Sequence, residues 1–265
     1  MSTDLLRLFH EQIRLADRDH GADLVIERDG LVHRAYPSDP AQAGAMVESP
    51  EGLGPDPDLA IRRQVEFFSQ RGQSVEWKTY AYDQPADLPE RLRAYGFVPD
   101  QTEALLLGAA ERLAEPVVLS DRYALRTLVG DAEWGQVGAL DEALFGSGRS
   151  QWSRLLRAEE TADPLHIRSV VVLEQDSGGL VGHAVLRLVE GTDVAGLWGG
   201  KVHPDHRGQG LYRAMTSLRA QWAIEAGHRI CRVDALPTSR PILERLGMVQ
   251  VTTTTPCVLS PSPAR

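Results

Sequence analysis

The chain has few cysteines and no long apolar run, and each scarcity excludes a class of protein. Its only cysteines, Cys231 and Cys257, both fall in expected strands, which indicates reduced, half-buried thiols and no disulfide framework. No apolar run approaches the roughly 20 residues that cross a bilayer. Residues 1–19 are amphipathic and lack the apolar core of a secretory signal. We therefore expect a cytoplasmic protein without a membrane partner.

Clustered positive charge is also missing. The formal net charge is −9, and basic residues are interleaved with acidic ones. Because neutralising nucleic-acid phosphates requires clustered cations, we expect no nucleic-acid partner. Lysine is confined to Lys78 and Lys201, a bias toward arginine that we attribute to genome composition. The 265 residues, 42% of them hydrophobic, are enough for two small globular domains.

Two segments of the chain share one order of expected elements. The first consists of a helix at 59–71, Gly72, a strand at 75–82, a helix at 88–95, Gly96 and a strand at 97–107. The second consists of a helix at 211–226, Gly227, a strand at 230–235, a helix at 240–246, Gly247 and a strand at 248–259. A glycine that follows a helix favours a left-handed C-cap. The repeated order predicts an internal duplication joined by a linker at 108–120; the alternative is two unrelated segments with common caps.

The second segment is preceded by a meander of alternating strands. We expect strands at 123–128, 165–174, 180–189 and 194–202, with helices at 132–144 and 150–160 between the first two. This predicts an α+β fold in which a mixed, mostly antiparallel sheet is flanked by helices. The expected domains are 1–110 and 118–260.

The stretch with the clearest chemistry is residues 202–215, which read VHPDHRGQGLYRAM. Gly208 and Gly210 allow the backbone to approach a ligand closely, and the helix that follows presents N–H groups and the positive end of its dipole. The stretch therefore predicts a site for a phosphate or pyrophosphate. It lacks the Lys-Ser/Thr of a P-loop and the third glycine of a dinucleotide fingerprint.

The pattern V-x-P-x-x-R-G-x-G, followed by an apolar helix, a strand and a short helix that ends at Leu246-Gly247-Met248, resembles the GNAT superfamily of acyl-CoA-dependent N-acyltransferases. The resemblance covers residues 120–259, and the tandem arrangement is similar to the mycothiol synthase type, in which one copy is inactive. Residues 50–58 contain no Arg-Gly-x-Gly, so the N-terminal copy is expected to be degenerate and without a pyrophosphate loop. The resemblance implies acetyl-CoA as acyl donor, bound by the backbone of Gly200, Val202, Arg207, Gly208, Gln209, Gly210, Leu211 and Tyr212.

Members of this family often use a glutamate on the fourth strand and a tyrosine in the last helix, and the matching positions here are Gly196 and Leu243. Other residues must then move the protons. The candidates are Asp234, which could accept a proton or cap the next helix, Tyr212, which could protonate the thiolate or only pack, and Glu142 with its neighbour Asp141, which could border the acceptor or lie on a solvated face.

Several other side chains have both a functional and a structural interpretation. His203 and His206 have a spacing compatible with metal ligation but no evident third ligand, so we expect no metal. His183 is expected in the core. Trp198, Phe145 and Trp152 either wall an acceptor pocket or belong to the core.

The sequence thus predicts an N-acetyltransferase that transfers an acetyl group from acetyl-CoA to a primary amine, on a small molecule, by direct attack in a ternary complex. One alternative is a noncatalytic acyl-CoA-binding module or sensor, because the usual acid and base are missing. The other is a peptide or protein N-acetyltransferase. We expect a monomer or a homodimer.

Overall fold

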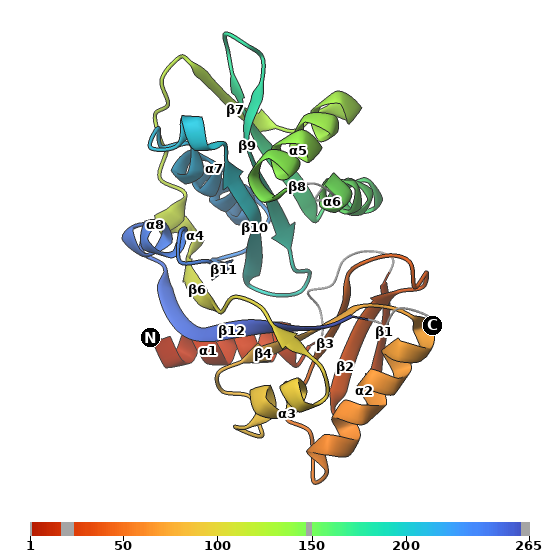
Figure 1. The fold of residues 1–265 in the computed structure, drawn as a ribbon. Helices are drawn as coiled ribbons and strands as arrows, with labels where there is room; N and C mark the ends of the chain where they lie inside the picture. Colours follow the sequence, from red (N-terminus) through yellow and green to blue (C-terminus); the bar gives the residue numbers. More distant parts are fainter. Residues whose placement is uncertain (1, 17–23, 147–149, 261–265) are drawn as a thin grey trace. The chain divides into compact units, whose positions relative to one another are not determined.

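The computed structural model describes residues 2–16, 24–146 and 150–260. The fold is α+β and divides into two compact units, each with strands and helices, whose order along the chain can be followed in Figure 1. Unit 1 comprises Met1–Leu106, Asp234–Arg240 and Gln250–Arg265; unit 2 comprises Leu107–Val233 and Pro241–Val249.

Unit 1 contains a mixed sheet in which only one neighbouring pair is parallel. Its strands are β1 (Leu24–Asp29), β2 (Val32–Pro37), β3 (Ala45–Glu48), β4 (Val75–Tyr80) and β12 (Val249–Leu259), in this spatial order, with β5 (Val98–Pro99) beside β12. Strand β3 is parallel to β4, and the other pairs are antiparallel. The helical segments are α1 (Ser2–Phe9), a π-helical turn (His10–Arg14), α2 (Pro57–Arg71) and α3 (Leu88–Ala94). Helix α2 is the crossover that the parallel pair requires.

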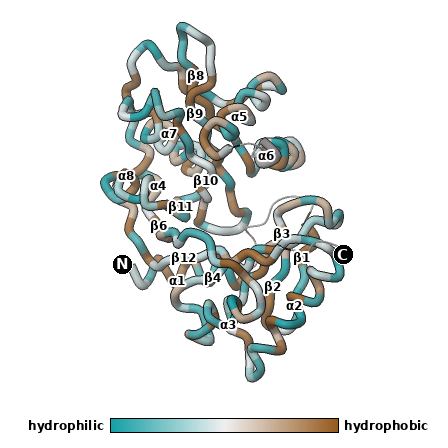
Figure 2. The backbone as a smooth tube through the Cα atoms, in the orientation of Figure 1, coloured by the Kyte–Doolittle hydropathy of each residue, from teal (hydrophilic) through white to brown (hydrophobic). Residues whose placement is uncertain are grey.

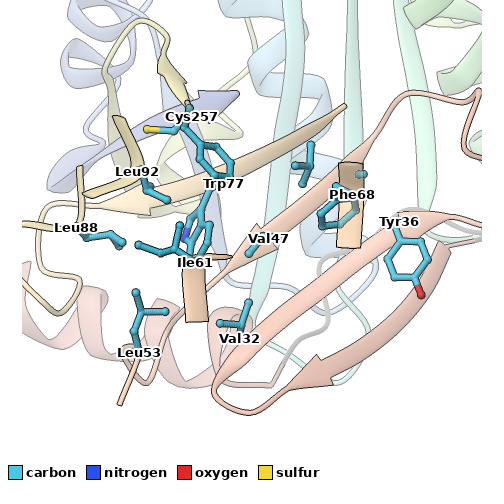
Figure 3. Packing of buried hydrophobic residues seen from close by; sticks show 13 residues of the cluster. Val32, Tyr36, Val47, Leu53, Ile61, Phe68, Trp77, Leu88, Leu92 and Cys257 are labelled. Carbon is cyan, nitrogen blue, oxygen red and sulfur yellow. The ribbon is translucent and has the colours of Figure 1, made fainter. Parts of the chain in front are cut away.

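Helices α2 and α3 pack on the strands of unit 1 through one apolar cluster. Figure 3 shows Ile61 of α2 and Leu92 of α3 near Trp77 of β4, with Phe68 of α2 on the Tyr36 side of the same cluster. Local signals define α2: the Asp56 carboxylate accepts a hydrogen bond from the Leu59 N–H at 3.0 Å, and Gly72 ends the helix with φ +60°. The expected helix at 59–71 is therefore correct in place and end, but it begins at Pro57.

Unit 2 begins with four consecutive antiparallel strands. These are β7 (Tyr123–Thr127), β8 (Ile167–Glu174), β9 (Leu180–Leu188) and β10 (Val194–Val202). Strand β11 (Ile230–Ala235) then lies parallel to β10. Its helices are α4 (Ala110–Leu113), α5 (Gly130–Phe145), α6 (Ser150–Ala162), a 3-10 turn (Pro204–His206), α7 (Leu211–Glu225) and α8 (Arg240–Arg245). The predicted bounds of β10 and β11 are confirmed.

Helices cover both faces of this sheet. Along β8, Val170 and Val172 pack in the same cluster as Leu211 of α7, whereas Val171 packs with Val137 of α5. Because successive strand residues point to opposite faces, α7 covers one face and α5 the other. Figure 2 shows the apolar positions concentrated on the central strands β8 and β9.

Two expected segments differ in the structure. The single strand expected at 97–107 is interrupted, giving β5 and β6 (Glu103–Ala109). Pro99 has no N–H to continue a ladder, and the Asp100 carboxylate bonds the Gln101 N–H at 2.7 Å in a local turn. The expected linker at 108–120 is also partly structured, since α4 buries Ala110 and Leu113.

The last strand of the second copy, β12, lies almost wholly in unit 1. Strand β12, at the end of the second copy, pairs with β4 of unit 1, with Thr254 opposite Tyr80. Strand β6, at the end of the first copy, runs from unit 1 into unit 2 and neighbours β11. The packed units therefore do not follow the division of the sequence into 1–110 and 118–260.

Candidate acyl-donor site

Strands β10 and β11 diverge in the middle of unit 2. Their parallel pairing runs from Val194 opposite Ile230 to Gly196 opposite Arg232 and ends there, while β10 continues to Val202. The register of β10 against β9 shifts between Trp198 and Lys201, and Gly199 adopts φ +59° within this bulge. The last part of β10 therefore keeps β9 on one edge and has lost β11 on the other.

The open edge of β10 presents backbone donors. The His203 N–H donates to the Val181 carbonyl of β9 at 2.8 Å. Because successive N–H groups of a strand point to opposite edges, the Val202 N–H faces the edge that β11 has left. By the same alternation, the Gly200 N–H faces this edge too.

Arg207 has a side-chain role that the sequence did not predict. Its Nε donates to the Val202 carbonyl at 3.2 Å. Strand pairing would otherwise use this carbonyl, so the guanidinium replaces β11 at the end of β10. The turn after β10 is also held by the Tyr123 hydroxyl, which lies 3.1 Å from His206 Nδ1.

The glycine turn leads into α7, and no acidic side chain lies at the N-terminus of this helix. Gly208 and Gly210 have φ of +75° and +79°, which other residues rarely adopt. Gly210 is the N-cap and offers no side chain, and the first turn contains no acidic residue. The Ala214 N–H is bonded to the Gly210 carbonyl at 2.9 Å, so the helix ladder does not use the N–H groups of the preceding turn. Such a terminus favours an anion.

The corresponding turn of the first copy has a similar backbone but a different charge. Gly52 and Gly54 both have positive φ, of +81° and +74°. However, the helix that follows is capped by the carboxylate of Asp56. The Asp56 carboxylate thus lies at the position where the second copy offers N–H groups to a ligand.

The space between the ends of β3 and β4 is filled as well. Arg14 donates to Glu48, at the end of β3, at 2.9 Å and to Asp83, beyond β4, at 2.7 Å. Its guanidinium carbon lies 4.0 Å from the centroid of the Tyr80 ring. Ligands commonly bind at the carboxyl ends of parallel strands. In unit 1, a buried ion-pair cluster lies at the carboxyl ends of β3 and β4.

The positions at which the family places its base and acid hold other groups. A Cβ on Gly196 would collide with the indole nitrogen of Trp198, so the tryptophan fills the volume of a missing side chain. Leu243 is fully buried in the core. Tyr212 lies against the strand, because a Cβ on Gly200 would be 2.8 Å from its ring. Tyr212 therefore lies next to the open edge of β10.

The first long helix of unit 2 directs Asp141, and not Glu142, toward the sheet. Asp141 is buried and forms an ion pair with Lys201 of β10, whereas Glu142 is exposed. Successive residues of a helix point in directions about 100° apart. The weak apolar pattern of this helix did not show which of the two carboxylates faces the sheet. The neighbouring His183 is buried, and its burial holds the pKa well below the usual value, in agreement with a core histidine.

Asp234 forms an ion pair within unit 1. Its Oδ2 lies 2.5 Å from Lys78 Nζ, and both side chains are almost completely buried. The pair gives Asp234 a partner that sequence reasoning missed, since Lys78 lies far away in the chain. Its catalytic role stays a prediction.

The remaining candidates have different surroundings. Phe145 is 58% exposed, which does not fit a core position, and the side chain of Trp152 lies outside the described residues. Among the residues that the structure describes, no group of three His, Cys, Asp or Glu side chains could hold a metal. Within the same part of the chain, no helix has the length and apolarity that crossing a bilayer requires.

The tandem fold, the open edge of β10 and the glycine turn are the features that the resemblance to acyl-CoA-dependent acyltransferases leads us to expect. Residues 138–248 match the model of the Acetyltransferase (GNAT) family. This part of the chain, which runs from within α5 to the residue before β12, is similar to that family, and the match supports an N-acetyltransferase with acetyl-CoA as acyl donor. No curated protein matches the sequence.

Solved structures support the two-unit fold over the whole chain. A GCN5-related N-acetyltransferase from Kribbella flavida has a TM-score of 0.67 at 14% identity and covers 100% of this chain and 95% of its own. A tandem GNAT protein from the clavulanic acid biosynthesis pathway has a TM-score of 0.63 at 14% identity, covering 92% and 86%. A GCN5-related N-acetyltransferase from Sphaerobacter thermophilus has a TM-score of 0.64 at 14% identity, covering 89% and 78%. The likeness shows a shared fold.

Proposed function

We propose that this enzyme transfers the acetyl group of acetyl-CoA to a primary amine of a small molecule by direct attack in a ternary complex. The observation that supports this best is the arrangement of two donor sets in one continuous segment. The open edge of β10 offers the Val202 N–H, and the acid-free N-terminus of α7 follows after one turn. The two sets suit the thioester and the pyrophosphate of one cofactor.

The backbone N–H groups of Arg207 to Tyr212 would bind the pyrophosphate, and those of Gly200 and Val202 would bind the acyl carbonyl. When the amine nitrogen attacks this carbonyl, the oxygen becomes negative, and donors already in place stabilise it. The C–S bond then breaks, the thiolate leaves and the nitrogen loses a proton. The Tyr212 hydroxyl would protonate the thiolate, because its ring lies against Gly200.

The sequence-based candidates for the acceptor of the amine proton are Asp234, whose carboxylate is held in the ion pair with Lys78, and the exposed Glu142. A small acceptor is supported by the Lys201–Asp141 ion pair, which joins α5 to the last part of β10. A peptide would need an open groove instead.

A noncatalytic acyl-CoA-binding module is the second candidate. The observation that favours it is the Trp198 indole, which occupies the volume beside Gly196 where the family often has its base. Acetyl transfer to any amine would exclude it.

The first test is acetyl-CoA binding by calorimetry. We expect micromolar binding by the wild type and none by the Gly208→Glu, Gly210→Glu double variant, because carboxylates would occupy the anion site. Gly178→Glu is a matched control: Gly178 also has positive φ (+66°) and open space around its Cβ position, but it lies in the β8–β9 turn.

An amine screen with free-thiol detection follows, with small amines and short peptides as separate sets. Thiol release with small amines supports the proposal. Release with peptides alone favours the peptide enzyme, and binding without any release favours the noncatalytic module. If the wild type does not bind acetyl-CoA, the proposal is wrong.

A further inference from the structure

Arg219 of α7 is a fully buried arginine that donates hydrogen bonds to three backbone carbonyls. Its Nε donates to the Met215 carbonyl of its own helix at 3.0 Å. A terminal nitrogen of the guanidinium donates to the Val185 carbonyl of β9 at 3.0 Å and to the Trp198 carbonyl of β10 at 3.2 Å. Only 1% of the residue is exposed, and this burial lowers its pKa to about 10.

A cation in this position is costly as a packing residue. Removing a charge from water is unfavourable, and an apolar side chain of similar size would pack in the same place without that penalty. The structure offsets the cost with hydrogen bonds to carbonyls of two different strands. The guanidinium therefore joins β9 and β10 from the face that α7 covers.

The two carbonyls lie at a specific point of the sheet. Val185 and Trp198 are cross-strand partners, and they form the last regular pair before the register of β10 shifts. Gly199, with its positive φ, follows at once, and Gly200 comes next. A bulge leaves part of the ladder unpaired and bends the strand, so carbonyls at its border need other donors. Arg219 supplies them.

The same helix also begins at the glycine turn. Leu211 at its first turn and Arg219 two turns later belong to one rigid element. Helix α7 follows the glycine turn at its N-terminus and contacts the bulge of β10 through Arg219. It therefore sets the distance between the N–H groups of the turn and those of β10. This spacing must match that between the pyrophosphate and the thioester of a single cofactor.

We propose that Arg219 is a positioning residue that holds β9 and β10 together at the bulge and thereby orients the Gly200 and Val202 N–H groups toward the acyl carbonyl. The use of these N–H groups rests on the proposed function, whereas the clamp on the bulge does not. Arg219 touches neither cofactor nor acceptor and acts through the strand.

The first experiment is amide hydrogen exchange of the ligand-free protein. Arg219→Met removes the donors at similar length, and Arg219→Lys keeps a charge and a donor. We expect Arg219→Met to speed exchange of the amides of β10 and of the adjoining His203 that bond to β9, by about tenfold, with β7 and β8 unchanged. Arg219→Lys should restore most of the protection. Uniformly faster exchange, or no change in β10, would overturn the clamp.

The second experiment is steady-state kinetics with the amine found in the screen. We expect Arg219→Met to lower kcat by about 100-fold, since misplaced donors lose most of their effect, with a much smaller change in KM for acetyl-CoA, because the glycine turn is intact. Arg219→Lys should recover most of kcat.

Arg14→Met is the matched control, since it also removes a buried arginine, but in unit 1. We expect it to lower the melting temperature and to keep kcat and KM of the wild type. Equal losses of kcat in Arg14→Met and Arg219→Met would reduce Arg219 to a general stabilising residue. A wild type without transferase activity would refute the proposed function, and hydrogen exchange would still test the clamp.

Discussion

Tyr212 combines two features at the residue scale: it opens α7, and its ring lies against Gly200 of the open strand edge. Its hydroxyl is our candidate donor to the leaving thiolate. Tyr212→Phe keeps the ring and removes the hydroxyl alone. We expect unchanged acetyl-CoA affinity by calorimetry and a kcat lower by about 100-fold, the usual contribution of a positioned acid. An unchanged kcat would assign Tyr212 to packing.

Glu103 gives a prediction about stability against pH. Burial raises its pKa to about 7, with Lys78 opposing the shift; the other carboxylates that contribute are Asp234, Glu76 and Asp100. An unfolded glutamate ionises from about pH 4.3 upward, whereas the folded one keeps its proton until about pH 7. The folded state binds more protons in this window, so its stability falls as the pH rises.

Glu103→Gln resembles the protonated form at every pH. We therefore expect the free energy of unfolding of the variant, minus that of the wild type, to become more positive between pH 4 and pH 8. Urea unfolding at both pH values measures it. A difference that stays constant with pH would show that Glu103 titrates normally.

At the scale of the element, α2 and α7 follow the same plan and differ at one end. Each helix is preceded by two glycines with positive φ, and each ends either at such a glycine or one residue before it. Residue types alone indicate these features. The N-termini differ because Asp56 caps α2 with its own carboxylate, while α7 begins at Gly210. A single residue thus converts an anion site into a closed helix end.

Strand β10 shows the limit of reading one element from its sequence. Its bounds follow from the alternation of residues 194–202, but neither the bulge nor the buried Arg219 that borders it is visible there. From the sequence alone, an arginine in a helix is expected to be exposed. Its burial is evident only when the strand carbonyls that it contacts are known. The same holds for Asp141 and Glu142, whose roles depend on the rotation of α5 against β10.

At the scale of the molecule, the two copies have become chemically unequal. The helix N-terminus of the first copy carries Asp56, and Arg14 occupies the ends of β3 and β4. We therefore predict that one chain binds one acetyl-CoA. Native mass spectrometry and calorimetric stoichiometry should both give one, and the Gly208→Glu, Gly210→Glu variant should leave no residual site. Two bound cofactors would show that unit 1 retains an acyl-CoA site.

The sequence by itself determined the α+β class, most of the element bounds from residue 59 onward and the glycine turn that we propose binds the pyrophosphate, because periodicity, glycine caps and the Arg207-Gly-x-Gly motif are local properties. Only the tertiary structure decided the pairing of β12 with β4, the ion pairs of Asp234 with Lys78 and of Asp141 with Lys201, and the contact of Arg219 with two strands. The physical reason is distance along the chain. A strand edge or a buried charge meets its partner through geometry that forms on folding, and neither the alternation nor the spacing of residues in the sequence determines that geometry.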